Sequence, residues 1–133
     1  MSRPVVVFAD LEQDAADFFA SWLAGRDEPV AAGVVVHIRT PEVRPSKLVT
    51  IRRAGGSGSY LLDVPRFAVT CWHDSDVQTA DLCALVRAGF YAMRGWRGFR
   101  GVRSMTGPVP APDTDGAPRY LLTAEITCKG ATP

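Results

Sequence analysis

The chain has 133 residues, of which 47% are hydrophobic and 22% are charged. This length predicts a single domain over residues 1–133, with enough apolar residues for one core. The formal net charge of +1 excludes a global field that would draw the protein to nucleic acid or to a membrane. No apolar run approaches the roughly 18 residues of a membrane span, and the apolar residues 5–9 are followed at once by acidic ones. We therefore expect neither a membrane span nor a leader peptide.

The first third of the chain predicts one helix and one strand. Asp10 is placed to cap a helix, with Gln13 three residues on, and Gly25 is a natural stop. Between them apolar residues recur at helical spacing, which indicates a face packed in the core. These residues are Leu11, Ala15, Phe18, Phe19, Trp22 and Leu23. Residues 33–39 (GVVVHIR) then predict a strand.

Residues 47–72 predict a hairpin, and the rest of the chain is organised around it. Val49 and Ile51 alternate with polar residues, and a second alternating run ends at Trp72. Between the runs lie Gly55, Gly56, Ser57, Gly58 and Ser59, which favour a mobile loop at about residues 53–60. Pro65 is expected just before the second strand, where a missing amide donor costs least.

The remaining residues predict a helix and two strands. Ser75, with Gln78 three residues on, opens a helix that continues to about residue 93. Gly89 within it costs about 1 kcal/mol relative to alanine, so we expect another element to approach closely there. Residues 99–106 give a weak strand pattern, residues 107–118 a proline-rich mobile loop, and residues 119–128 a clear strand.

The predicted order is therefore α-β-β-β-α-β-β. An α+β domain follows, with a mainly antiparallel mixed sheet and two helices packed on one face.

The sequence predicts no catalytic, cofactor-binding or metal site. Cys71, Cys83 and Cys128 lie in apolar surroundings without paired ligand spacing, which indicates reduced, buried thiols and not a zinc site. His37 and His73 are the only imidazoles, and neither belongs to a recognisable nucleophile motif. The glycine-rich run has no following lysine, so it is not a phosphate-binding loop.

One cluster stands out in residues 94–103 (RGWRGFRGVR). Arg94, Arg97, Arg100 and Arg103 recur every third residue, with Trp96 and Phe99 between them. Arginines with interleaved aromatic rings suit phosphate contact combined with base stacking. The alternative is a solvated connector whose two aromatic rings tuck under the second helix, with arginines that pair with acidic neighbours or another subunit.

Several short runs, in their order and spacing, resemble the tail terminator proteins of long-tailed, siphovirus-type bacteriophages, especially those of actinobacterial hosts. The runs are VTIRRAGG at residues 49–56, DVPRF at 63–67, Cys71-Trp72, Gly107-Pro108, Pro112-Asp113 and GAPRY at 116–120. The similarity extends from the first helix to Cys128. None of the runs is catalytic.

The resemblance implies a structural virion protein and not an enzyme. Such proteins cap the tail tube, end its polymerisation and form the head–tail joining surface, usually as a ring of six subunits. The implied partners are further copies of the chain, the major tail tube protein, the head–tail connector protein and the genomic DNA that passes through the lumen. The implied location is the head-proximal end of the virion tail, with assembly in the host cytoplasm.

Two surfaces are candidates for these contacts. We expect Arg52, Arg53 and residues 55–59 to contact the tail tube or a neighbouring subunit. We expect the four arginines of residues 94–103 to line the lumen or a subunit contact. Two alternatives remain open: a head–tail connector or neck subunit, and a small nucleic-acid-binding module that uses residues 94–103.

Overall fold

Both helices begin at the predicted caps. A computed structural model of the protein describes residues 3–8 and 10–130. The helices are α1 (Leu11–Ala24) and α2 (Asp76–Ala92). The side chain of Asp10 accepts a hydrogen bond from the Gln13 amide at 3.1 Å, and Ser75 accepts one from the Gln78 amide at 3.1 Å. These bonds satisfy amides that have no partner within the helix, so both predicted caps are confirmed.

Five strands form one mixed sheet in the order β1-β2-β3-β5-β4. The strands are β1 (Val35–His37), β2 (Leu48–Gly58), β3 (Leu62–Trp72), β4 (Phe99–Pro110) and β5 (Arg119–Lys129). β1 runs parallel to β2, whereas every other neighbouring pair is antiparallel. The predicted order of helices and strands is confirmed, with a short 3-10 turn, η1 (Pro29–Ala31), in addition before β1.

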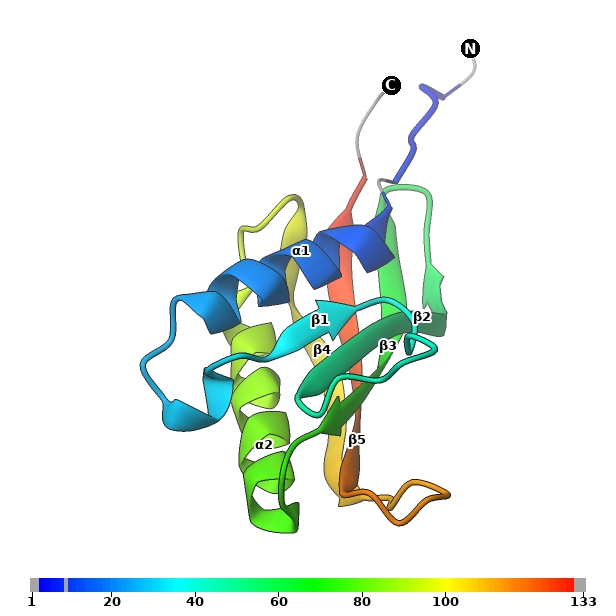
Figure 1. Cartoon of the computed structure of the whole chain (residues 1–133). Coiled ribbons are helices and arrows are strands. Elements are labelled where there is room, and N and C mark those ends of the chain that lie inside the picture. Colours follow the sequence, from blue (N-terminus) through cyan, green and yellow to red (C-terminus); the bar gives the residue numbers. More distant parts are fainter. Residues whose placement is uncertain (1–2, 9, 131–133) are drawn as a thin grey trace.

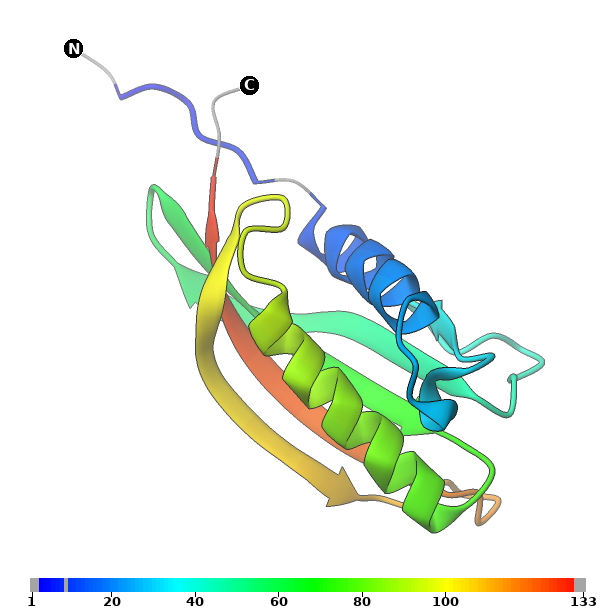
Figure 2. The same ribbon diagram turned by 90° about the vertical axis from the view of Figure 1, so that its left-hand side faces the viewer.

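The two helices cover the same face of the sheet (Figure 1, Figure 2). α1 lies over β1 and β2, and α2 lies along β3, β5 and β4. Aromatic rings join the layers. Phe19 of α1 lies 4.8 Å from Phe90 of α2 between ring centroids, and Phe90 lies 6.2 Å from Phe67 of β3. One core between the helices and the sheet follows, as the α+β prediction requires.

α1 packs closely against α2 at Gly89. A Cβ atom added there would lie 2.5 Å from Cε1 of Phe19 and 2.8 Å from Cζ3 of Trp22. These separations are shorter than side chains tolerate, so only glycine fits while the rings stay in place. The predicted close approach at this glycine is confirmed.

The predicted mobile loop at about residues 53–60 is wrong in its extent. Residues 53–58 belong to β2, where Gly56, Ser57 and Gly58 pair with Pro65, Val64 and Asp63 of β3. Glycine has a low strand propensity, but backbone pairing needs no side chain, and the irregularity between Arg53 and Gly56 absorbs the positive φ angles of Gly55 and Gly56.

The other strand ends also differ from the predictions. Residues 107–110 belong to β4, which leaves residues 111–118 to connect β4 to β5. β1 is shorter than the predicted residues 33–39 at both ends, because it begins at Val35 and ends at His37. Pro65 lies inside β3 and not before it. It fits because the pairing of β3 with β5 is interrupted between Asp63 and Arg66.

Candidate functional site

Residues 94–103 form the turn after α2 and the beginning of the edge strand β4. Gly95 and Gly98 adopt positive φ angles of 91° and 88°, which glycine accepts without steric cost, and they turn the chain toward the sheet. The Lys129 amide donates a hydrogen bond to the Gly98 carbonyl at 2.9 Å, and the Gly95 amide donates one to the Phe99 carbonyl at 2.8 Å. The turn is therefore fixed to the end of β5 and is not a freely solvated connector.

The two aromatic residues of this segment point into the protein. Phe99 is only 2% exposed, and Trp96 packs edge-on against Phe18 of α1 with 5.7 Å between ring centroids. The indole N–H of Trp96 donates to the Asp14 carbonyl at 3.0 Å. The alternative that both rings tuck inward is thus correct in direction, although Trp96 contacts α1 and not only the second helix. Neither ring is free to stack on a nucleic-acid base.

Arg97 fixes the turn to α1. Its guanidinium donates to the carboxylates of Asp14 at 2.9 Å and Asp17 at 2.8 Å, and it stacks over the Trp96 ring at 4.5 Å. Hydrogen bonds from Gln13 and then Arg97 lower the pKa of Asp17, and those to Asp14 and Asp17 raise the pKa of Arg97. Arg97 is thus paired inside its own chain, with its side chain still 47% exposed, and its contact with a lumen or a partner stays a prediction.

The other three arginines of the segment remain available. Arg94, Arg100 and Arg103 are exposed, and no ion pair holds any of them within residues 3–8 and 10–130. Lys129 at the end of β5 is likewise exposed and without an ion pair among these residues. We call these four residues the basic edge.

The edge strand itself sets the spacing of the basic edge. The pairing of β4 with β5 shifts between Phe99 and Gly101 and again between Val102 and Ser104. Arg100 and Arg103 are the residues at these two shifts, which have the character of β-bulges. A bulge leaves its extra residue out of the ladder, so Arg100 and Arg103 have no partner in β5, and both side chains are exposed.

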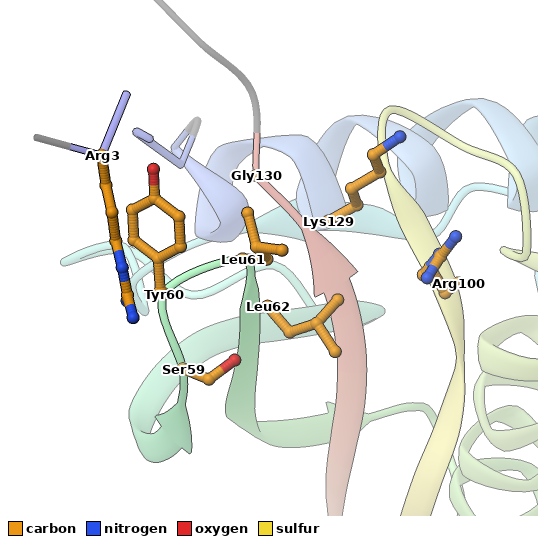
Figure 3. Close-up of a pocket in the computed structure, with 8 residues that line it drawn as sticks. All are labelled: Arg3, Ser59, Tyr60, Leu61, Leu62, Arg100, Lys129 and Gly130. Carbon is orange, nitrogen blue, oxygen red and sulfur yellow. The ribbon is translucent and has the colours of Figure 1, made fainter. Parts of the chain in front are cut away.

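A pocket of about 680 Å³ lies beside the basic edge, at the tip of the β2–β3 hairpin (Figure 3). Tyr60, Leu61 and Leu62 give it an apolar surface, with Arg3 on one side and Lys129 and Arg100 on the other. Arg3 stacks over the Tyr60 ring at 5.0 Å. We call this the tip pocket, which combines an apolar floor with flanking cations. Such a surface suits an acidic partner that also carries apolar side chains.

The hairpin residues predicted to contact a partner divide into two groups. Arg53 donates to both oxygens of Asp63, at 2.5 and 2.8 Å, and its amide donates to Glu12 at 2.8 Å. Its pKa is raised mainly by the hydrogen bonds to Asp63, so Arg53 has a structural role. Arg52 is exposed and has no ion pair within the described part of the chain. Of residues 55–59, only Ser59 lines the tip pocket.

The structure thus brings together the ends of the two predicted surfaces. Ser59 from the hairpin and Arg100 from the arginine segment line the same tip pocket. Sequence reasoning missed Arg3, Tyr60, Leu61 and Lys129, which complete it. The continuous run of β-branched and aromatic residues 5–8 (VVVF) after Arg3 was the available signal for an extended segment, but nothing in it indicated where that segment packs.

Within the described residues no three His, Cys, Asp or Glu side chains lie where they could hold a metal ion. Cys71, Cys83 and Cys128 are free and buried, as predicted. The neighbouring Cys83 and burial raise the pKa of Cys71, and burial raises the pKa of Cys128 to about 12. Such thiols form little thiolate and are poor nucleophiles.

His73 is buried and held between backbone groups. Its Nδ1 accepts from the Asp74 amide at 2.8 Å, and its Nε2 lies 3.1 Å from the Val30 carbonyl. A neutral imidazole with its proton on Nε2 satisfies both contacts. The ring joins the end of β3 to η1, which is a structural role.

Comparison of the chain with protein-family models, with curated proteins and with solved structures gives no match. Among residues 3–8 and 10–130, neither helix is long and apolar enough to cross a membrane.

Proposed function

We propose that this protein is a structural component of a bacteriophage virion that caps the tail tube and ends its polymerisation. In this proposal six copies form a ring, whose upper surface joins the filled head and whose lumen passes the genome. The partners are further copies of the chain, the major tail tube protein, the head–tail connector protein and genomic DNA. The protein acts at the head-proximal end of the tail, without catalysis, cofactor or membrane.

The basic edge is the observation that carries the proposal. Arg94 lies in the turn after α2, Arg100 and Arg103 on the edge strand β4, and Lys129 at the end of the neighbouring β5. Arg100 shares one pocket with Lys129 and another with Arg94, and none of the four has an ion pair among the described residues. Cations gathered in this way attract an anionic partner. Genomic DNA in a lumen, or an acidic face of a neighbouring subunit, supplies such a partner. The choice of a tail terminator among ring proteins rests on the sequence resemblance.

The tip pocket supports a second contact, with the tail tube. Leu61 is 58% exposed at the hairpin tip, in the pocket that Arg100 and Lys129 also line. Replacing Leu61 by serine removes apolar contact area while the strand pairing of residues 56–58 stays intact. We expect Leu61→Ser to lower the yield of complete particles, with Val43→Ser as the control at an exposed apolar residue elsewhere. Normal tail assembly with Leu61→Ser would contradict the tail-tube contact.

Electron microscopy of phage particles assembled without this reading frame tests the function itself. Overlong tubes without heads, beside filled heads, are the expected result for a tail terminator. Tails of normal length with unattached heads would indicate a neck or connector subunit instead. Fully normal virions would refute a structural role in the virion.

The basic edge also favours a second candidate function, a small nucleic-acid-binding module. For about three phosphate contacts, binding to a short DNA duplex should weaken roughly 40-fold between about 50 and 200 mM salt. Arg100→Ala and Arg103→Ala should each weaken that binding, whereas Arg97→Ala should not, because Arg97 is paired with Asp14 and Asp17. Absence of DNA binding by the isolated protein at low salt would exclude this second candidate.

A further inference from the structure

The segment before α1 forms an extended arm (residues 3–8) with two different sides. Val6 and Phe8 are half-buried, and a Cβ added to Gly130 would lie 2.6 Å from Cγ1 of Val6, so the inner side packs against the end of β5. The Tyr60 hydroxyl donates to the Pro4 carbonyl. The outer side presents Val5, 67% exposed, and Val7, 46% exposed. The arm is thus held from one side while two valines on its other side face solvent.

A groove of about 590 Å³ lies between η1 and α2, on the helical side of the domain. Its walls are mainly apolar, and Asp81 at its rim has no ion pair among the described residues. The apolar lining consists of Pro29, Val30, Ala84, Leu85 and Ala88. We call it the η1–α2 groove.

The arm and the groove match in length and in chemistry. Six extended residues span about 17–20 Å, and the stretch of α2 from Gln78 to Ala88 spans about 15 Å. The arm brings two exposed valines and the cation of Arg3, and the groove offers apolar walls and the carboxylate of Asp81. An exposed ion pair contributes little energy, so the valines would supply the affinity and the charges the direction.

The two surfaces of one copy do not face each other. In both views the arm leaves one end of the domain, beside the hairpin tip, while η1 and α2 lie toward the other end (Figure 1, Figure 2). A contact between two different surfaces is heterologous, and it joins copies head to tail into a closed ring or an open chain.

We propose that the arm of one copy docks in the η1–α2 groove of a second copy, with Val5 and Val7 against the apolar walls and Arg3 toward Asp81. The proposal rests on the self-association that the proposed ring requires, and it names the contact between subunits. It does not depend on which virion component the ring meets.

Cross-linking of two singly substituted full-length proteins tests the contact. Val5→Cys protein is mixed with Ala84→Cys or Ala88→Cys protein that carries a mass tag, with oxidised glutathione as the oxidant. The three native cysteines are buried, so the introduced thiols are the accessible ones. Docking holds the two thiols together, so the tagged heterodimer should form at least about five times faster than with a Val43→Cys partner. Val43 is a matched control, because it is 86% exposed and lies on another surface.

A second variant separates docking from random encounter. Val7→Ser added to the Val5→Cys protein should weaken the association about tenfold, because it removes one buried apolar side chain. Val43→Ser should leave the cross-linking rate unchanged. Equal rates for the groove and control partners, in proteins whose thermal unfolding shows that they are folded, would overturn the docking.

Microscopy of phage particles that were assembled without this reading frame distinguishes failure of the arm contact from failure of the proposed function. Overlong tails together with equal cross-linking rates would retain the tail terminator and reject the arm contact. Normal virions together with selective cross-linking would retain the arm contact and reject the tail terminator.

Discussion

Replacing Gly89 by alanine tests how closely α1 and α2 are packed. In an ordinary helix interior this change stabilises by about 1 kcal/mol, because alanine has the higher helix propensity. At this position the new Cβ would lie 2.5 Å from Phe19, which is fully buried, and 2.8 Å from Trp22. The opposite sign of effect is therefore expected.

The size of the effect follows from these two opposing contributions. Overpacking a well-packed core costs about 1–3 kcal/mol, and the buried Phe19 ring, which cannot move into solvent, places the cost near the upper end. After the gain in helix propensity, a net loss of roughly 2 kcal/mol in the free energy of unfolding remains. For a chain of 133 residues this lowers the melting temperature by about 7 °C.

Urea unfolding of four proteins measures this effect: the wild type, Gly89→Ala, Phe19→Leu and the double variant. The smaller side chain that Phe19→Leu introduces gives the new methyl group space, so the double variant should be more stable than the sum of the single effects by about 1 kcal/mol. Ala88→Gly, at the exposed neighbouring position, reports the helix propensity alone. A neutral or stabilising Gly89→Ala would refute the close packing of the two helices.

The other predictions concern the hairpin and a buried thiol. Gly56→Ala should cost about 1–3 kcal/mol of unfolding free energy, because φ is 126° and the new Cβ would lie 2.2 Å from the Val64 carbonyl oxygen. Gly55→Ala should cost less, because its φ of 92° is strained for alanine but the new Cβ would meet no atom within 4 Å. Equal losses for the two variants in urea unfolding would contradict this geometry. Burial raises the pKa of Cys128 from 9.0 to about 12, so the unfolded chain loses this proton first and stability should fall as the pH rises from 9.0 toward 12. Unfolding at several pH values should give a shallower fall for Cys128→Ala, and an unchanged slope would show that another group is responsible.

The sequence was sufficient for the fold because its local signals agree with one another. Asp10 and Ser75 are side-chain caps that act within three residues, and Gly89 is conspicuous on the buried face of its helix. The alternation of apolar and polar residues within each strand is likewise a local signal, and it predicted the order of the elements. The extent of β2 could not be predicted, because its glycine-rich end is stabilised by pairing with β3 and not by its own residues.

The candidate site was only partly predictable, because it depends on contacts between distant residues. Four equally spaced arginines gave no indication that Arg97 is bound by acidic residues about 80 positions earlier. Lys129 belongs with Arg100 only because β5 lies beside β4 in the sheet. Arg3 joins them through the packing of the arm on the hairpin tip.

The two arginines in the bulges of β4 also protect the open edge of the sheet. An open edge strand of 12 residues is a template on which a second sheet can grow, and uncontrolled growth of this kind leads to aggregation. Edge-to-edge pairing of two β4 strands would bring Arg100 and Arg103 of one chain near those of another, and the bulges interrupt the flat hydrogen-bonding surface that such pairing needs. The same side chains that make this edge attractive to an anion therefore oppose the pairing of two copies through β4.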